Sequence, residues 1–492
     1  MRKSSQQLHS LIKSLNPSEK RYFHGFAQRH VIGEENQYLT LFQAIDRLTE
    51  WDEEALREKL GNQSQADYLP VAKHQLYQQV LDSLHQFHRQ HHPPVRVQQW
   101  LHQAELLTTR GLMSQADKLL QKAHKAALDR EDQTLLLSVL RARQRYLTRR
   151  GLAQVNPHEL EALIQAETNC LTALQQEHQL WAWSAQLFRQ HATQANDTEL
   201  SEFLEEEVEP LSFQAELAYH QARGTWHYLR GEMEQALTAN QTRLDAFYQR
   251  PQRIRHYPGP YLSTLNNYLV DCLRLGRHDE MQQPMSTARA LIDQPAYRKV
   301  PRLAMDVFRL TYLIELNLRL NQRDYPAANA IIPTVEAGLK RYQAQLPLLN
   351  LLTFHYLLAY IAFQQNGWRV SLRRLQPLLN HPKRNQFPAL TQAALLLQLL
   401  IHYELGDQDL LAHLLRRYER QLPEAYTFLG KALVRTLRQV TATPERAVQR
   451  QTWEALAKEL TDTPQTGLLQ YVDVGEWVNQ QLTSRLDKRN KE

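Results

Sequence analysis

Residues that interrupt helices are scarce in this chain, which has only 15 glycines and 21 prolines among 492 residues. This share lies well below the usual one and argues against a turn-rich all-β fold. No sustained alternation of β-branched or aromatic residues with polar ones occurs, so we expect no β-structure. Only Cys170 and Cys272 are present, far apart in the sequence. They form no disulfide framework, and we predict two reduced thiols in the core.

Long apolar runs are also lacking, since no stretch approaches the ~18 apolar residues that a bilayer-spanning helix requires. Near the N-terminus, His9, Lys13 and Asn16 interrupt any apolar segment that a signal peptide would need. We therefore predict a cytoplasmic protein without a membrane partner. The formal charge of +6 is mild for this length, so it allows an acidic protein or a nucleic acid as partner and requires neither.

Sequence motifs of catalysis are absent as well. The chain has no GxxxxGK[ST] or GxGxxG loop for phosphates, no HExxH and no GxSxG. The glutamates between 199 and 209 are expected to form a solvated helix face, and His85, His88, His91 and His92 a solvated helix end. We expect no catalytic residue, no cofactor and no metal. The alternative is an enzyme whose catalytic triad comes together only in the folded chain.

What the chain does contain is a recurring break between amphipathic stretches. Gly231, Gly276, Asn321 and Asn366 follow one another at intervals of 45 residues. Weaker breaks extend the series, which then runs through positions 111, 151, 196, 231, 276, 321, 366 and 406. A fixed period of about 20–50 residues is typical of stacked helical units, each of which buries its apolar face only against its neighbours.

The residues around these breaks resemble the tetratricopeptide repeat, in which Gly or Asn closes the first helix of a hairpin and small or apolar residues recur in the second. Gly231 is followed by Ala236 and Asn240, and Gly276 by Met281 and Met285. The resemblance implies an all-α fold, an α-solenoid of antiparallel helical hairpins in a right-handed superhelix. Because the family repeats at about 34 residues, the interval of 45 predicts longer helices here.

The array does not account for the whole chain. We expect an N-terminal helical cap over residues 1–95, the repeat array over 96–440, and a C-terminal helical cap with a charged tail over 441–492. Residues 11–23 resemble the start of an uncharacterised group of such proteins in Bacteroidota, which implies no activity. In the first cap, Asn16 and Glu19 predict a capping box. Val71, Leu76 and Val80 predict the apolar stripe of a helix from 70 to about 90.

Two segments, 250–260 and 381–388, combine prolines with basic residues and break the helical pattern. Because proline disrupts a helix interior, we expect both to be loops between helices. Loops at unit junctions line one edge of a solenoid, which makes Arg253 and Arg255 candidates for partner binding. Plain solvated connectors are the alternative.

A stripe of arginines is the clearest sign of charge segregation. Arg141, Arg145 and Arg149 are spaced at i, i+4 and i+8, so they share one helix face. Aligned guanidinium groups suit phosphates or carboxylates, because each offers planar bidentate donors. The alternative is a solvated basic face that Glu131 and Asp132 partly neutralise.

Aromatic and amide side chains on the first helices of the hairpins are further candidates for contacts with a partner, unless they pack in the core between helices. They are Trp226, Tyr228, Asn267 and Tyr268. In the N-terminal cap, polar residues near the start of the long helix could contact nucleic acid if the segment is a degenerate helix-turn-helix. These are Lys73, His74, Gln75 and Tyr77. The alternative is a plain cap on which they are solvated.

Taken together, these patterns predict a non-catalytic scaffold that docks a partner protein or peptide along a helical-repeat surface. Nucleic-acid binding through the N-terminal helices and the Arg141, Arg145 and Arg149 stripe is the second hypothesis. The identity of the partner and the oligomeric state do not follow from the sequence.

Overall fold

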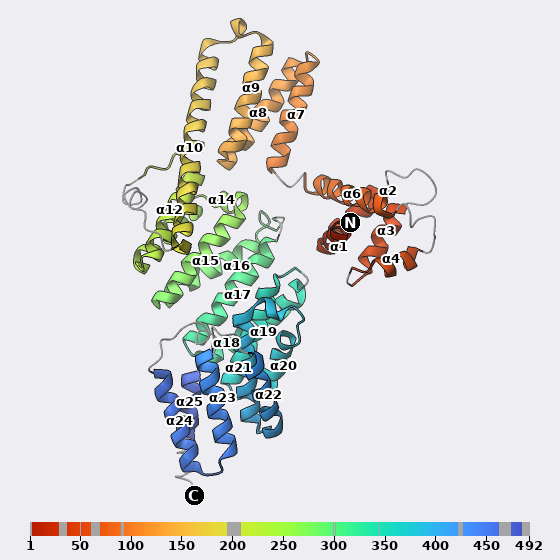
Figure 1. Cartoon of the computed structure of the whole chain (residues 1–492). Helices are drawn as coiled ribbons and strands as arrows, with labels where there is room; N and C mark the ends of the chain where they lie inside the picture. The colour runs from red at the N-terminus through yellow and green to blue at the C-terminus, as the bar shows by residue number, and fades with distance from the viewer. Residues whose placement is uncertain are drawn as a thin grey trace. The chain divides into compact units, whose positions relative to one another are not determined.

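The computed structural model describes residues 2–28, 37–49, 51–60, 69–89, 93–193, 208–298, 300, 302–343, 345–421, 427–461 and 474–484. These residues form helices and connecting turns without any strand, which confirms the all-α prediction (Figure 1). Several predicted features lie outside the described residues. They are the break at 196, the glutamates at 199–207, His91 and His92, and the charged tail.

The chain divides into two compact units, Met1–Asp271 and Cys272–Glu492. The division falls inside α15 (Pro258–Leu275). Each unit is described by itself below. The boundaries expected at 95 and 440 stay predictions.

The first unit begins with five helices: α1 (Arg2–Ser14), α2 (Pro17–Gln28), α3 (Gln37–Asp46), α4 (Glu53–Leu60) and α6 (Leu69–Arg89). The capping box predicted at the start of α2 is confirmed. Asn16 Oδ1 accepts from the Glu19 backbone N–H at 2.9 Å, and Glu19 Oε2 accepts from the Asn16 N–H at 2.8 Å. The predicted stripe of α6 needs one correction, because Val71 is 50% exposed while Leu69, Leu76 and Val80 are buried.

The rest of this unit comprises α7 (Pro93–Thr109), α8 (Met113–Arg130), α9 (Gln133–Arg150), η1 (Leu152–Gln154), α10 (Pro157–Thr193), α12 (Phe213–Leu229), α13 (Met233–Tyr248), α14 (Gln252–His256) and the start of α15. Consecutive helices pack together from α7 through α13, and α7 also contacts α9.

The segment 250–260 is not the extended loop that the sequence predicted. Pro251 immediately precedes α14, and Pro258 is the first residue of α15. Both prolines occupy helix starts, where the missing N–H costs nothing and the fixed φ favours the helix. The segment therefore turns the chain through a short helix. In contrast, the segment 381–388 has only the 3₁₀ turn η3 (Arg384–Gln386) before α21 begins at Pro388.

The second unit is a succession of helices around one continuous core. It contains η2 (His278–Glu280), α16 (Gln282–Asp293), α17 (Leu303–Asn321), α18 (Tyr325–Tyr342), α19 (Leu348–Gln364), α20 (Trp368–Leu379), α21 (Pro388–Leu405), α22 (Gln408–Gln421), α23 (Thr427–Ala442), α24 (Arg446–Thr461) and α25 (Val474–Ser484). Each helix from α16 to α25 packs against the next, and α19 also contacts α17 and α21. Trp453 and Trp477 meet edge to face at 5.2 Å in this core.

The breaks predicted at 111, 231, 276, 366 and 406 are left-handed turns of one geometry, whereas Gly151 has φ of 97° and ψ of 107°. In these turns φ lies between 61° and 78°, at Gly111, Gly231, Gly276, Asn366 and Gly406. After each of them, the next backbone N–H bonds to the carbonyl five residues back, as Glu232 does with His227 at 2.9 Å. This is the pattern of a Schellman C-cap, which glycine adopts without strain. At the break predicted at 321, the left-handed residue is instead Arg323.

Burial alternates between the two helices of a hairpin. No side chain is exposed over 213–227 of α12, 303–320 of α17, 350–364 of α19 or 389–405 of α21. The helices that follow them, including α13, α18, α20 and α22, each present an exposed face. These four helices are thus covered on every side, whereas α15, which precedes the turn at Gly276, exposes Ser263, Asn266 and Asn267. Within the described ranges, no helix is both long and apolar enough to cross a membrane.

Two glycines inside helices give a matched test of this packing. A Cβ on Gly338 of α18 would collide with the Phe308 ring, which is stacked on Phe354 at 5.4 Å and has little room to move. We expect Gly338→Ala to lower the free energy of unfolding by about 1–3 kcal/mol. Chemical denaturation of the full chain measures this change.

The control is Gly25→Ala in α2, where a Cβ would meet no atom within 4 Å. It should stabilise the chain by about 0.5–1 kcal/mol, because alanine loses less conformational entropy than glycine on helix formation. Equal effects of the two substitutions would contradict the tight contact at Phe308.

Candidate binding site

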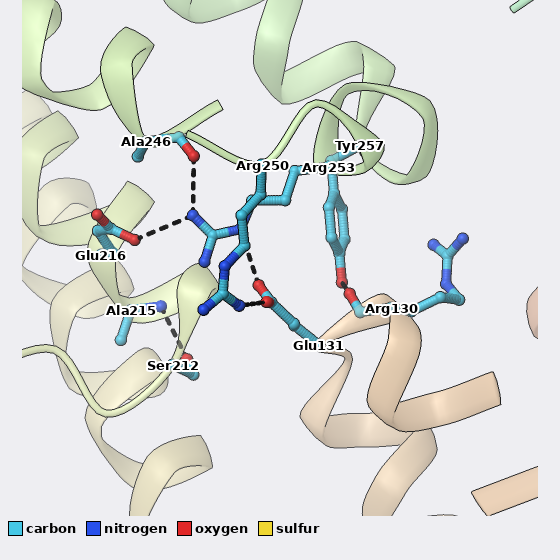
Figure 2. A network of polar contacts seen from close by, with 9 residues as sticks. All are labelled: Arg130, Glu131, Ser212, Ala215, Glu216, Ala246, Arg250, Arg253 and Tyr257. Atoms are coloured by element: carbon cyan, nitrogen blue, oxygen red, sulfur yellow. Dashed lines mark hydrogen bonds and ion pairs between the residues drawn. The ribbon is translucent and has the colours of Figure 1, made fainter. Parts of the chain in front are cut away.

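The turn between α8 and α9 is the first component of the site. Glu131 caps α8 with φ of 56°, and Asp132 accepts from the Leu135 N–H at 3.0 Å at the start of α9. A non-glycine residue in the left-handed region costs about 1–3 kcal/mol and persists where its surroundings fix it. Here the Glu131 carboxylate contacts Arg250, from the link between α13 and α14, and Arg253 of α14, and these contacts hold the turn (Figure 2).

Arg253 is the central residue of this contact. Its Nε donates to Glu131 Oε2 at 2.8 Å, and its Nη1 donates to the Ala246 carbonyl at 2.8 Å (Figure 2). Glu216 Oε2 lies 3.6 Å from the same Nη1. The guanidinium also lies over the Phe213 ring, 4.0 Å from its centroid. With the side chain only 10% exposed, these partners compensate its charge at several positions.

A second pair of contacts fixes the same turn from the other side. The Tyr257 hydroxyl donates to the Arg130 carbonyl at 2.8 Å (Figure 2). Arg130 Nη2 donates to the His256 carbonyl at 3.2 Å. We call Arg130, Glu131, Arg250, Arg253 and Tyr257 the clamp. It joins two segments that are far apart in the sequence, since its contacting pairs are separated by 119 to 127 residues.

A cavity of about 530 Å³ opens beside the clamp. Its walls come from the α8–α9 turn, the start of α12 and the α13–α14 link. Glu131, Glu216, Arg250 and Arg253 supply charged walls, and His220 lines it farther along α12. At its edge, Leu128 is 49% and Leu211 52% exposed. The site therefore combines an apolar rim with a charged floor whose groups are already paired.

Burial determines the electrostatics around this cavity. Burial, together with the charges of Arg223 and Arg243, lowers the pKa of His220 to about 4. It also lowers the pKa of His256 to about 4 and raises the pKa of Tyr257 to about 12. Both histidines are therefore neutral at pH 7. The charges that line the cavity are thus those of Glu131, Asp132, Glu216, Arg250 and Arg253.

Among the described residues, no three His, Cys, Asp or Glu side chains come together in a way that could hold an ion. Of the histidines expected at a solvated helix end, His88 is only partly exposed, and its Nε2 lies 2.8 Å from Glu19 Oε1.

The arginine stripe lies on α9 and is exposed, but its members differ. Arg141 pairs with Glu167 at 2.5 Å. Arg145 and Arg149 have no ion pair among the described residues and line a cleft of about 30 Å³. Glu131 does not neutralise this stripe, as the alternative interpretation had it, because its carboxylate belongs to the clamp.

The other residues predicted to contact a protein partner separate into buried and exposed ones. Trp226 and Tyr268 are buried, at 8% and 4% exposure, and Arg230 covers the Trp226 ring. Tyr228 and Asn267 are exposed. Arg255 is exposed as well, whereas Arg253 is not the solvated loop residue that its sequence context suggested.

The nucleic-acid candidates do not form one exposed surface. Lys73 is 6% exposed, donates to Glu53 Oε1 at 3.1 Å and lies over the Trp51 ring. That hydrogen bond lowers the pKa of Glu53. Tyr77 packs against the core of the N-terminal helices, while His74 and Gln75 are exposed. Lys73 is therefore unavailable to a phosphate.

Sequence reasoning missed Glu131, Arg130 and Tyr257 as members of one site. The only signal was an acidic residue placed at a helix junction, together with arginines and a tyrosine in a proline-bearing segment. Nothing in either segment points to the other, because their contact depends on how α9 to α13 pack between them.

Comparisons with known proteins add no identity. No family model matches the chain, and no curated protein or solved structure matches it either.

The clamp can be tested by Glu131→Gln. The substitution removes the charge that faces Arg250 and Arg253 and leaves Arg253 with Glu216 as its remaining acid. We expect the free energy of unfolding to fall by about 1–3 kcal/mol. A double-mutant cycle with Arg253→Met should give a coupling energy of about 0.5–3 kcal/mol.

Glu454→Gln is the matched control, because Glu454 pairs with Arg450 where both side chains are at least half exposed. Such a pair contributes no more than about 0.5 kcal/mol. A coupling energy near zero for Glu131 and Arg253 would mean that the clamp does not hold the α8–α9 turn.

The burial of His220 predicts a pH dependence of stability. Its pKa in the folded chain is about 4, below the ordinary value of 6.5. The neutral form is therefore favoured by folding, and this stabilisation is complete above pH 6.5 and lost as the pH falls toward 4. Near pH 5, unfolding should take up as much as about one more proton in the wild type than in His220→Gln.

Denaturant titrations from pH 7 to 4 give the proton uptake from the slope of the free energy of unfolding. An NMR titration of the His220 ring in the folded chain measures its pKa directly. A midpoint near 6.5 would contradict the buried position of the ring.

Proposed function

We propose that this chain is a non-catalytic scaffold, in which tetratricopeptide-like hairpins stack into an α-solenoid that docks a segment of a partner protein. The proposal rests above all on the helices that open the hairpins, α12, α17, α19 and α21, which expose no side chain over most of their length. A hairpin cannot cover its first helix on every side by itself. Neighbouring hairpins must do so, as they do in a solenoid.

The recurring turns support the same proposal. One left-handed geometry at 111, 231, 276, 366 and 406 reverses the chain after a helix of similar length each time. Helices then pack in chain order, with additional contacts from α17 to α19 and from α19 to α21. Most of the helix contacts join near neighbours in the chain, as a stack of repeats would produce, and the clamp is a contact over a longer range.

The cavity beside the clamp is the proposed docking point. Leu128 and Leu211 at its rim are half exposed, and the charged groups beneath them already have partners within the chain. An apolar side chain of the partner segment would cover both leucines, and polar backbone groups of that segment would face the paired charges. This mixture of an apolar anchor and a polar surround is common in protein interfaces.

Nucleic-acid binding is the weaker hypothesis. Among its N-terminal candidates, Lys73 forms an ion pair with Glu53. In the arginine stripe, Arg141 forms an ion pair with Glu167. Arg145 and Arg149 are left, which is few phosphate contacts for a dedicated binder.

Photo-crosslinking in native cytosol tests the proposal. A photoreactive amino acid replaces Leu128, Leu211 or Arg149, and Thr238 on the exposed face of α13 serves as the control position. We expect nuclease-resistant protein adducts at 128 and 211 and none at 238. Adducts that nuclease removes, formed mainly at 149, would favour nucleic acid. Equal labelling of all positions would contradict a defined docking point.

Leu211→Asp provides the affinity test once an adduct identifies the partner segment. Leu211 is 52% exposed, so the substitution should leave the fold intact. We expect at least about a tenfold loss of affinity, because a charge replaces an apolar contact at the centre of the interface. Fluorescence anisotropy with the labelled segment measures it, and Thr238→Asp should bind like the wild type.

A further inference from the structure

Arg243 on α13 is a buried cation with incomplete hydrogen bonding. Its side chain belongs to a residue that is only 4% exposed. Nη2 donates to Gln221 Oε1 at 2.9 Å, whereas Nε and Nη1 have no hydrogen-bond partner within the described structure. Buried donors are almost always satisfied in folded proteins, so two unsatisfied ones on one guanidinium require an explanation.

No carboxylate compensates this charge in the part of the chain that the structure describes. Asp271 of α15 is buried and contacts α13, but it accepts from Asn240 Nδ2 at 2.7 Å. Desolvation without a neighbouring acid lowers the pKa of Arg243 to about 10. Of the other buried arginines of this region, Arg253 has two carboxylates, and Arg130 donates to the His256 carbonyl but has one unpartnered donor, Nε. Arg243 has two such donors, Nε and Nη1.

A second guanidinium lies in the same hairpin. Arg223 of α12 is half-buried, donates from Nη1 to the Tyr219 hydroxyl at 3.3 Å and lies over that ring. Its Nε has no partner among the described residues either. The positive charges of Arg223 and Arg243 both contribute to the lowered pKa of His220. Arg243 also contacts Gln221, which lies between His220 and Arg223 on α12. The cluster thus holds two positive charges and no negative one.

The cluster borders the cavity. His220 lines the 530 Å³ space, and the next residue, Gln221, is the hydrogen-bond partner of Arg243. Arg223 follows on the same helix and is partly open to solvent. Arg223 and Arg243 do not line the cavity themselves, so a small group would have to pass His220 to reach the two guanidinium groups.

We propose that Arg223 and Arg243 form a binding site for an oxyanion, a carboxylate or a phosphate, between α12 and α13. An oxyanion satisfies the free Nε and Nη1 donors in the planar geometry that guanidinium groups prefer. It also supplies the missing negative charge. The group can belong to a small molecule or to an acidic side chain of a partner. The proposal does not depend on the docking function proposed above.

Thermal unfolding of the full chain tests the site, with inorganic phosphate compared against chloride at equal ionic strength. We expect the midpoint to rise by about 5 °C at a phosphate concentration about 100 times Kd. A second arm uses a short glutamate-rich peptide. A response to phosphate identifies a free-anion site, and a response to the peptide alone identifies a site for acidic side chains of a partner.

Three variants separate binding from a structural role. Arg243→Met should raise the midpoint without ligand, since it removes an uncompensated buried charge, and should abolish the response to ligand. Arg223→Gln, at a half-buried position, should weaken binding at least about tenfold while the chain stays folded. Arg255→Gln, which is exposed, should respond like the wild type.

Two results would overturn the proposal. One is a wild-type midpoint that neither phosphate nor the acidic peptide changes. The other is an equal response in wild type, Arg223→Gln and Arg243→Met, which would locate the anion elsewhere. Failure of the crosslinking at 128 and 211 would leave this site unaffected.

Discussion

The left-handed turn after the first helix of a hairpin is the constraint on which the rest of the structure depends. It returns the chain at once, so the two helices that it joins pack against each other, as α12 and α13 or α19 and α20 do. Gly231, Gly276 and Gly406 make this turn without strain, while Asn366 and Arg323 adopt it at some cost. Over most of their length, α12, α17, α19 and α21 expose no side chain, so a partner would have to contact other parts of the surface.

The clamp follows from one such turn. Glu131 occupies the left-handed position between α8 and α9, which aims its carboxylate at Arg250 and Arg253. The contact holds an early turn against the α13–α14 link and leaves the 530 Å³ cavity beside it. Burying a charge between helices is costly, and at the clamp the hydrogen bonds around Arg253 offset that cost.

Cations in the described part of the chain divide into those that pair with a carboxylate and those that do not. Lys73, Arg253 and Arg143 each contact a carboxylate, at 3.1, 2.8 and 2.7 Å, and serve the fold. Arg243 and Arg223 have none, and one of them is almost wholly buried. A net charge of +6 conceals this division, because it counts a paired lysine and an unpaired arginine alike.

Local physics let the sequence by itself determine the helices, the capping box at Asn16, and the breaks at 111, 231, 276, 366 and 406. Each of these depends on residues within one or two turns of each other. Only the tertiary structure decided that Lys73 is buried against Glu53, that the prolines of 250–260 start helices, and that Glu131 meets Arg253. Those outcomes depend on which distant segments pack together, and neither member of such a pair carries a local mark of the other.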